Sequence, residues 1–385
     1  MTDGFRWHPS ARLCDGAGRW TGPIAATGSI LPDSPAGLAQ AMGLAAFRIG
    51  APDAPAPTPG AVPVFETLTS GSTGTPRRIR RTQASWTASF AVNAGLGIGP
   101  SARVAVLGRL VHSLALYGAV EGLHLGAEVH LLDSLRPDRQ RRALADRRIT
   151  QLYATPAQLR LLAGAQGLCP DLRVVLVGGS KLDPGLRAAL ADMAPAAEIR
   201  EFYGAAETSF ITIADAATPP DAVGRPYPGV TLTLDPTGEV WVKSPYLFLG
   251  YEGGDGGARW RDGWLSVGEI GALQDGHLVL RGRAGRMVTV ADQNVFPEEI
   301  ETLMQTLPGV LRAAVLPIAD PLRGAVLVAV VQGDPGAEPA ILAALRAALG
   351  PLKSPKALIW RQDWPSLPSG KTDLRALAAG VTWPA

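Results

Sequence analysis

Between residues 103 and 204 the chain alternates short apolar runs with amphipathic stretches. The apolar runs have the length of buried strands and lie at residues 103–108, 127–132, 149–154, 172–179 and 198–204. The stretches between them have the periodicity of helices and lie at residues 113–126, 137–148, 156–165 and 184–193. This alternation predicts an α/β domain whose mostly parallel sheet is covered by helices on both faces.

The pattern changes after about residue 223. Alternating residues around a Pro-Thr-Gly turn predict a hairpin over 230–244, and 277–283 predicts another strand of a small antiparallel β unit. A third pattern then predicts a compact α+β unit, with helices over 296–307 and 339–349 and strands over 311–318 and 325–333. We therefore expect a large N-terminal domain at residues 1–281 and a smaller C-terminal α+β domain at residues 282–385.

The first 63 residues give few signals of regular structure. Residues 1–50 are rich in Gly and Ala with weak periodicity, and 50–63 indicate a Pro/Ala linker or an extended surface segment.

Composition narrows the class of protein. At 385 residues, with 46% hydrophobic and 18% charged residues, the chain has the composition of an ordinary soluble protein of two or more domains. A net charge of +2 gives no strong field for nucleic acid, and Cys14 and Cys169 are too isolated for a disulfide framework or a metal site. No signal peptide is evident, and no apolar run reaches the roughly 18 residues of a membrane span, so we expect a cytoplasmic protein.

The stretch "TLTSGSTGTPRR" (67–78) places many small hydroxyl residues and glycines between a strand-like run and arginines. Free backbone N–H groups and hydroxyls beside positive charge favour a phosphate-binding loop. A solvated Ser/Gly linker is the alternative. The loop is not a Walker loop, because Gly71 and Gly74 are three residues apart and no lysine follows them.

Four further motifs follow this loop in order: "VGGSKL" (177–182), "FYGAAETS" (202–209), "DGWLSVGEIGAL…LRGRAGRMV" (262–288) and "LPSGKTDLRAL" (367–377). Together the five motifs resemble the adenylate-forming superfamily, which includes acyl-CoA synthetases, aryl-acid CoA ligases such as 4-coumarate–CoA ligase, peptide-synthetase adenylation domains and luciferase. The resemblance covers residues 62–377. It implies a large AMP-binding domain, with an atypical and shortened first subdomain at residues 1–60, followed by a mobile C-terminal domain.

The resemblance implies a role for each motif in binding ATP. The phosphate loop would hold the β- and γ-phosphates through Thr69, Ser70, Gly71, Ser72, Thr73 and Gly74, with Arg77 where the family has a lysine. The nucleotide would also meet Gly178, Gly179, Ser180, Tyr203 and Gly204. The two glycines would let the backbone lie flat against adenine or the acyl group, and Tyr203 would stack on adenine. Taken alone, the Gly-Gly pair indicates only a turn.

Five charged or titratable residues would complete the site. Glu207 matches a Mg²⁺-associated glutamate, although such a residue alone would simply be solvated. Glu269 stands where the family has an aspartate that accepts from the ribose hydroxyls, and Arg283 matches an arginine that reaches the nucleotide. Lys371 would bridge carboxylate, α-phosphate and ribose oxygen during adenylation. The chain has only five lysines among its 36 basic residues. A lysine at residue 371 therefore argues against a surface position where arginine would serve equally well. His112 matches an aromatic-or-His position beside the carboxylate pocket, and it could equally be a satisfied core residue.

The resemblance implies an ATP-dependent, AMP-forming acid–CoA ligase that uses ATP, Mg²⁺ and coenzyme A. The expected pocket lining of Ala205, Ala206, Gly178, Gly179, Leu114 and Leu116 is small and apolar, which favours an aromatic, cinnamic or medium-chain apolar acid. Loading of an acyl carrier protein and a non-catalytic nucleotide-binding paralogue are the alternatives. The shortened first subdomain would open the acyl pocket or leave an oligomer surface, with a homodimer as the oligomer considered.

The chain departs from the family pattern at several positions. Arg286 stands at the hinge position, where the family has Asp or Lys, and Thr289 replaces a lysine. Asp292 replaces a glycine of the loop that delivers the thiol, although Asp tolerates left-handed turns. Ala206 replaces a Thr directly before Glu207.

Overall fold

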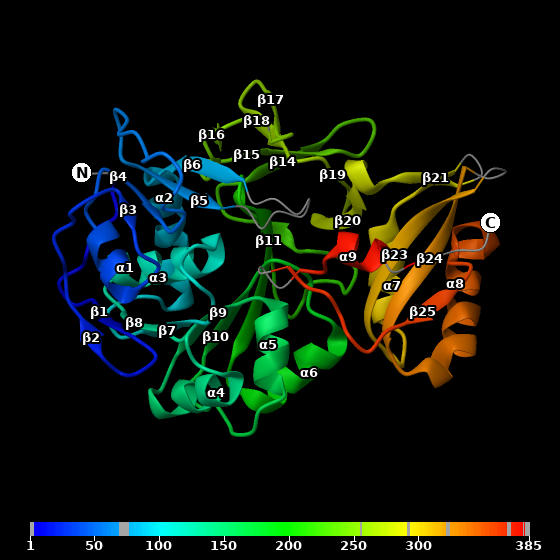
Figure 1. Cartoon of the computed structure of the whole chain (residues 1–385), viewed down its shortest axis with the longest axis horizontal. Coiled ribbons are helices and arrows are strands. Elements are labelled where there is room, and N and C mark those ends of the chain that lie inside the picture. The colour runs from blue at the N-terminus through cyan, green and yellow to red at the C-terminus, as the bar shows by residue number, and fades with distance from the viewer. Residues whose placement is uncertain are drawn as a thin grey trace. The chain divides into compact units, whose positions relative to one another are not determined.

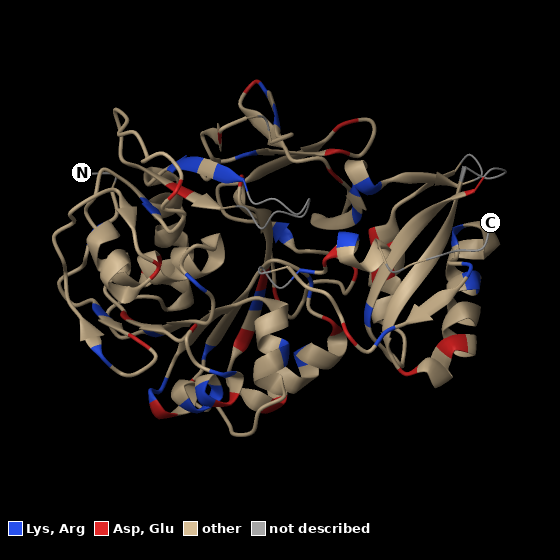
Figure 2. Cartoon of the chain, in the orientation of Figure 1, with Lys and Arg blue, Asp and Glu red and all other residues tan. Residues whose placement is uncertain are grey.

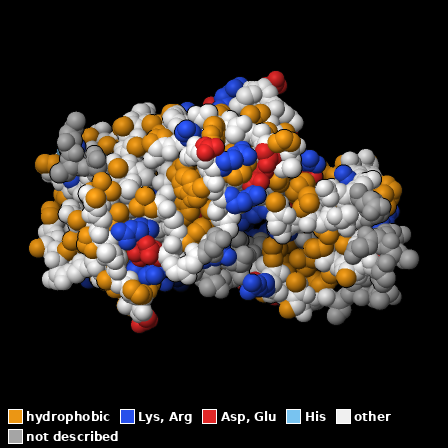
Figure 3. Space-filling model, turned by 90° about the horizontal axis from the view of Figure 1, so that it is seen from above, with side chains coloured by type: hydrophobic (Ala, Val, Ile, Leu, Met, Phe, Trp, Pro, Cys, Tyr) orange, Lys and Arg blue, Asp and Glu red, His pale blue; other side chains and the backbone are white. Residues whose placement is uncertain are grey.

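A computed structural model describes residues 4–68, 77–254, 256–290, 293–320, 324–367, 371–379 and 381. The chain divides into two compact units (Figure 1). The first comprises residues 1–232 and 242–265, and the second comprises residues 233–241 and 266–385. The chain therefore passes between the units three times. On the face drawn in Figure 3, basic and acidic side chains lie in small mixed groups among apolar ones.

The main sheet of the first unit has nine strands in the order β13–β12–β11–β10–β9–β7–β8–β1–β2. They are β1 (Arg12–Cys14), β2 (Trp20–Thr21), β7 (Arg103–Val106), β8 (Glu128–Leu131), β9 (Gln151–Ala154), β10 (Val174–Val177), β11 (Glu198–Ala205), β12 (Ser209–Ala214) and β13 (Arg225–Pro226). Neighbours from β11 to β1 pair in parallel, and the two ends of the sheet pair antiparallel. The mostly parallel sheet predicted from the apolar runs is therefore confirmed.

Helices cover both faces of this sheet. On one face, α2 (Ala84–Asn93) and α3 (Ser113–Leu125) pack against Val104 and Val106. On the other face, α4 (Pro137–Asp146), α5 (Pro156–Ala163) and α6 (Pro184–Met193) pack against Ala105 and Leu107. Alternate residues of β7 thus enter two separate cores, as the two-residue period of a strand requires. The four helices predicted between residues 113 and 193 are confirmed.

A second sheet of the first unit has the order β16–β6–β5–β4–β3. Its elements, with the helix beside it, are β3 (Ile30–Leu31), α1 (Pro35–Ala41), β4 (Ala46–Ile49), β5 (Val64–Leu68), β6 (Arg78–Thr82) and β16 (Gly250–Glu252). Strand β6 is basic along its length (Figure 2). The start of the Pro/Ala-rich segment at residues 50–63 is held by hydrogen bonds. Buried Arg48 donates to the carbonyls of Ala51, Ala54 and Pro55, and it pairs with Glu66 at 2.6 Å.

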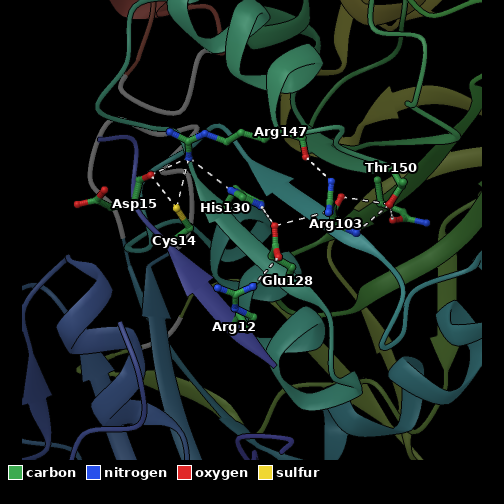
Figure 4. A network of polar contacts seen from close by, with 9 residues as sticks. Arg12, Cys14, Asp15, Arg103, Glu128, His130, Arg147 and Thr150 are labelled. Carbon is green, nitrogen blue, oxygen red and sulfur yellow. Dashed lines mark hydrogen bonds and ion pairs between the residues drawn. The ribbon is translucent and has the colours of Figure 1, made fainter. Parts of the chain in front are cut away.

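The first 50 residues hold short elements that the sequence pattern does not reveal. Strand β1 extends the main sheet beside β8, and a polar network fastens it there (Figure 4). Arg147 donates to the carbonyls of Asp15 (2.8 Å) and Gly16 (2.7 Å), at the turn after β1. On β8, His130 pairs with Glu128 at 2.9 Å. Strands of two or three residues are too short for a periodic signal, so these contacts and pairings define them.

The remaining elements lie after residue 230. A four-stranded sheet in the order β14–β15–β18–β17 contains β14 (Thr231–Leu234), β15 (Val240–Lys243), β17 (Arg259–Arg261) and β18 (Trp264–Ser266). The second unit contains the antiparallel pairs β19 (Glu269–Gln274) with β20 (His277–Arg283), and β21 (Val288–Val290) with β22 (Gln293–Val295). Its core joins the sheet β23 (Val310–Asp320), β24 (Gly324–Gly333) and β25 (Leu358–Trp360) to α7 (Pro297–Gln305) and α8 (Glu338–Lys353). Helix α9 (Leu374–Ala378) packs through Leu377. The predicted hairpin and α+β pattern are confirmed.

Candidate active site

The topology of the main sheet places several candidate residues at the ends of neighbouring strands. Strand β7 is followed by α3 and by β8 on one side, whereas β9, β10 and β11 lie on its other side. Ligands of open α/β sheets bind where the connections diverge in this way, beyond the carboxyl ends of the strands. His112 follows β7, Gly178 and Gly179 follow β10, and Glu207 follows β11.

The predicted phosphate loop begins beside His112. Thr69, Ser70, Gly71, Ser72, Thr73 and Gly74 lie outside the described residues. Leu68, at the end of β5, forms a parallel bridge with His112. The hydroxyl of Ser113 donates to Oγ1 of Thr67 at 3.1 Å. The described residues therefore bring the start of the predicted loop to the N-terminus of α3.

His112 occupies the N-cap position of α3 but makes no capping hydrogen bond with its side chain. The imidazole is half-buried. Burial lowers the pKa of His112 and Arg109 lowers it further, whereas Asp33 acts in the opposite direction. The imidazole is therefore neutral at pH 7, a form in which one ring nitrogen donates and the other accepts. A neutral donor beside the predicted loop is compatible with contact to a substrate carboxylate.

The two glycines after β10 are required for different reasons. Gly179 has a φ of +103°, which an L side chain rarely adopts, and an added Cβ would meet only Thr155, at 3.6 Å. Gly178 is buried, and an added Cβ would lie within 3.0 Å of three ring carbons of Phe202. Phe202 therefore fills the space that the sequence interpretation assigned to adenine or to the acyl group. Gly179 and Ser180 are exposed.

Tyr203 and Gly204 lie at an irregularity in the pairing of β11 with β12. The register shifts between these two residues, so that Gly204 pairs with Phe210. A Cβ on Gly204 would collide with the carbonyl oxygen of Ser209. Gly204 is thus needed for a close approach of two backbones, and the bulge sets the position of Tyr203. Tyr203 is half-buried.

Glu207 is held by a tyrosine that the sequence interpretation did not include. The hydroxyl of Tyr251, on β16, donates to Oε1 of Glu207 at 2.7 Å. The backbone carbonyl of Glu207 accepts from the amide of Phe248 at 2.8 Å. The guanidinium of Arg77 lies 6.0 Å from the centre of the Tyr251 ring and donates to the carbonyl of Gly256. Arg77, Tyr251 and Glu207 therefore form one chain of contacts.

Arg81 supports the turn that carries Glu207, and it was also missed. Its side chain is fully buried and donates to the carbonyl of Ala206 at 2.5 Å and to Oγ of Ser209 at 2.7 Å. It also donates to the carbonyl of Tyr246. Burial lowers the pKa of Arg81 to about 9, and the charge of Glu207 opposes this effect. The only sequence signal was an arginine on the apolar face of a strand, where a charge has to be paired or hydrogen-bonded.

In the second unit, Glu269 and Arg283 face each other across the pair of β19 and β20. They are register partners, and Nε of Arg283 lies 2.8 Å from Oε1 of Glu269. The side chain of Glu269 is 9% exposed and that of Arg283 is 40% exposed. The carboxylate is therefore oriented by the arginine, and the structure brings together two residues that the sequence assigned separately to the nucleotide.

Lys371 lies shortly before α9. Its carbonyl accepts from the amide of Leu367 at 2.8 Å. The neighbouring Thr372 accepts at Oγ1 from the indole of Trp364 at 3.0 Å, and Trp364 packs against the buried residues around Leu316. The backbone of Lys371 is thus held by its hydrogen bond to Leu367 and by the contacts of its neighbour Thr372, as a candidate catalytic side chain requires.

Arg286 stands where the family resemblance implies a hinge, and it is bound to α7 of the same unit. It contacts Glu301 through two nitrogens, at 2.7 and 3.1 Å, and Glu298 at 3.3 Å. These glutamates raise the pKa of Arg286 against the effect of burial. Thr289 lies on β21, and its hydroxyl is 3.4 Å from Oδ1 of Asn294. Asp292 lies outside the described residues.

Neither a membrane helix nor a preformed metal cage is found in the part of the chain that is described. None of its helices is both long and apolar enough to cross a membrane. It contains no cluster of three or more His, Cys, Asp or Glu residues suited to a metal ion. Mg²⁺ that is bound together with nucleotide phosphates needs only one or two carboxylates, so Glu207 fits such an ion.

Comparisons with known proteins decide the family. The profile of the AMP-binding enzyme family matches residues 23–252, and the profile of its C-terminal domain matches residues 299–371. The chain belongs to the AMP-binding enzyme family. It is thus an adenylate-forming enzyme of the acid–thiol ligase class, as the order of its motifs predicted.

Two relatives and one solved structure illustrate how far the similarity extends. The chain is 32% identical to an uncharacterised acyl-CoA ligase, YhfT of Bacillus subtilis, over 80% of this chain and 67% of that protein. It is 29% identical to a fatty acid–[acyl-carrier-protein] ligase, ScoC of Streptomyces coeruleorubidus, over 82% of this chain and 67% of that protein. ATP-bound MatB of Rhodopseudomonas palustris has the same fold, with a TM-score of 0.73, 24% identity, and coverage of 91% of this chain and 78% of that one.

Proposed function

We propose that this AMP-binding enzyme is an ATP-dependent, AMP-forming ligase that joins a small carboxylic acid to coenzyme A. The match of both family profiles, in order along one chain, carries this proposal. A carboxylate oxygen attacks the α-phosphorus of ATP and displaces pyrophosphate, which gives an acyl-adenylate. The thiol of coenzyme A then attacks the acyl carbonyl, and AMP leaves with the carboxylate oxygen while the thiol proton is released.

The first unit supplies the residues proposed to bind ATP and Mg²⁺. Glu207, oriented by Tyr251 at 2.7 Å, is the proposed Mg²⁺ ligand. Arg77 contributes charge beside the loop that is proposed to hold the β- and γ-phosphates, and Tyr203 is proposed to stack on adenine. Preorganised charge of this kind is the main contribution that a protein makes to phosphoryl and nucleotidyl transfer. Neutral His112 is proposed to contact the substrate carboxylate.

The second unit supplies the residues proposed to act on ribose and on the α-phosphate. Glu269 carries one oxygen toward Arg283, and its carboxylate is proposed to accept from the ribose hydroxyls. Lys371 is proposed to stabilise the charge that develops during adenylation. We further propose that residues 282–385 act as a mobile domain, that the protein functions in the cytoplasm, and that it forms a homodimer.

Loading of an acyl carrier protein is the second candidate function. Similarity to ScoC, a relative named for ligation of fatty acids to an acyl carrier protein, favours it. Both candidates share the adenylation step and differ only in the thiol acceptor. A silent nucleotide-binding protein would perform neither step.

Product analysis tests the proposal. The purified protein, MgATP and a panel of carboxylic acids are incubated with coenzyme A or with a phosphopantetheine carrier protein, and the nucleotides are separated. AMP and pyrophosphate with acyl-CoA are expected. Acyl transfer to the carrier alone would favour the second candidate, and ADP with phosphate would contradict both. ATP binding without pyrophosphate release for any acid would indicate a silent protein.

A further inference from the structure

Phe202 occupies the space beside the carboxyl end of β10. Three ring carbons of Phe202 lie within 3.0 Å of the position that a Cβ on Gly178 would take. The ring therefore rests on Gly178 and fills the side of that residue where a side chain would project. Only Gly179, whose added Cβ would meet nothing nearer than Thr155 at 3.6 Å, leaves room on this strand end.

The ring of Phe202 is backed by a wall of buried aromatic side chains. It meets Phe210 edge-on, with centroids 4.7 Å apart. Phe210 stacks on Tyr227 at 4.5 Å and packs edge-on against Tyr117 at 5.2 Å. Phe210, Tyr227 and Tyr117 are all at most 5% exposed. Because this wall is close-packed, Phe202 cannot withdraw into it to accommodate a longer substrate without displacing several rings.

A buried polar cluster lies behind the aromatic wall. The carboxyl of Glu121 accepts from Asn93 at 2.9 Å, from Tyr117 at 3.0 Å and from Tyr153. Tyr227 donates to the side-chain oxygen of Asn93 at 2.7 Å. Each of these groups has its partner within the protein, so a displaced ring would also break buried hydrogen bonds.

Phe202 is nevertheless the accessible member of this group. It is half-buried, as are the other residues from Ile199 to Ala205 on β11, whereas the neighbouring strands β9 and β10 are buried along their lengths. The ring therefore forms the boundary between the open end of the sheet and the core. Leu116, predicted to line the acyl site, is 1% exposed and belongs to the core behind that boundary.

We infer that Phe202 is the residue that limits the length of the acyl group, and that the enzyme takes short-chain aliphatic acids rather than medium-chain or cinnamic acids. This inference rests on the proposed function, because it concerns the acid activated at the same site. It revises the expectation drawn from the small residues of the sequence motifs. The phenyl ring of Phe202, which packs against Gly178, makes the acyl pocket shallower than those small residues predicted.

A comparison of chain lengths tests the inference. ATP–pyrophosphate exchange is measured with acetate, propionate, butyrate, hexanoate, octanoate and cinnamate for the wild type, Phe202→Leu and Phe202→Ala. In an accessible apolar site, each methylene added to the acid raises kcat/KM about fourfold, the ratio that corresponds to about 0.8 kcal/mol. A wild type limited by Phe202 shows the reverse, a fall in kcat/KM beyond butyrate. We expect Phe202→Ala to raise the octanoate-to-butyrate ratio of kcat/KM at least tenfold, with Phe202→Leu in between.

Phe90→Leu is the matched control. Phe90 belongs to the same buried cluster and packs against Tyr117 at 5.4 Å, on α2 rather than at the strand end. It should leave the length profile unchanged, which separates a general loosening of the core from a widened acyl site. Each variant is also tested for cooperative thermal unfolding and for ATP binding.

The outcomes distinguish this inference from the proposed function. Exchange by the wild type with octanoate or cinnamate as efficient as with butyrate would overturn the inference and leave the ligase activity standing. An unchanged length profile in folded Phe202→Leu and Phe202→Ala would also overturn it. Exchange with no acid in any variant that binds ATP would contradict the proposed function itself.

Discussion

The guanidinium of Arg81 donates a 2.5 Å hydrogen bond to the carbonyl of Ala206, the residue directly before Glu207. The same side chain reaches Ser209 and Tyr246, so one buried cation joins the two ends of the turn that carries Glu207 to the segment after β15. The position of the proposed Mg²⁺ ligand therefore depends on a residue more than 120 positions earlier in the chain.

Arg81→Ala should reduce both stability and the use of MgATP. It leaves buried carbonyls without a donor, at about 1–3 kcal/mol for each unsatisfied group. Chemical denaturation and the KM for MgATP measure the two effects. Arg81→Lys should recover part of the stability but less of the MgATP affinity, because the single ammonium of lysine cannot reproduce the forked set of donors of a guanidinium.

Arg80→Ala is the control for Arg81. Arg80 directly precedes Arg81 on β6 and contacts Thr58 and Glu252 instead. It should change the KM for MgATP little. Equal effects of Arg80→Ala and Arg81→Ala on that KM would contradict a specific role for Arg81.

Lys371→Ala should impair adenylation and spare the second half-reaction. Removing one preorganised donor should lower the adenylation rate by about 10²–10³-fold. Thioester formation from supplied acyl-adenylate should remain near the wild-type rate. Single-turnover measurements of each half-reaction test this split, and Lys356→Ala is a suitable control, because Lys356 donates to the carbonyl of Pro351 instead. An equal loss in both half-reactions would show that Lys371 has a structural role.

Glu269→Gln should weaken ATP binding by roughly 1.5–3 kcal/mol, the range for hydrogen bonds to a charged group. The substitution keeps the size of the side chain and removes the charge that faces Arg283. Glu269→Asp separates two causes. Lower activity would show that ribose lies at the reach of Glu, and equal or higher activity would show that the longer side chain is neutral. Calorimetry measures the affinities, and unchanged values in both variants would exclude contact of this acid with ribose.

Glu121 predicts a pH dependence of stability. Burial raises the pKa of Glu121 to about 7, although three hydrogen bonds act in the opposite direction. Because the folded-state pKa lies above the unfolded value, the contribution is fully present below about pH 4.5 and is lost as the pH rises to about 7. The loss amounts to about 3 kcal/mol.

Glu121→Gln removes this titration while keeping most of the hydrogen bonds. Compared with the wild type, the variant should therefore gain stability between pH 5 and pH 8, as measured by denaturant unfolding at each pH. A constant difference between the two proteins across this range would contradict the raised pKa.

The sequence predicted the elements whose signals are long enough to be periodic. The strands and helices from Arg103 to Ala205 and the C-terminal α+β pattern are found in the structure, because each buries a regular apolar face. Strands β1 to β4 were not predicted. They have two to four residues, and their pairing partners and the Arg147 contacts define them instead.

The motifs named candidate residues for the site but not the side chains that surround them. Tyr251 and Phe202 were missed because their contacts with Glu207 and Gly178 depend on strand register. Arg81 was hidden in a basic run, and only the fold shows that it points inward. The pairing of Glu269 with Arg283 likewise follows from the register of β19 and β20.

The most direct test of the proposed acyl-adenylate intermediate is the fate of the substrate oxygen. A carboxylic acid labelled with ¹⁸O in both oxygens is converted in the presence of MgATP and coenzyme A, and the AMP and pyrophosphate are analysed by mass spectrometry. If the carboxylate attacks the α-phosphorus and the thiol then releases AMP, each AMP carries one ¹⁸O and pyrophosphate carries none. Label in phosphate or pyrophosphate, or unlabelled AMP beside labelled thioester, would contradict an acyl-adenylate intermediate.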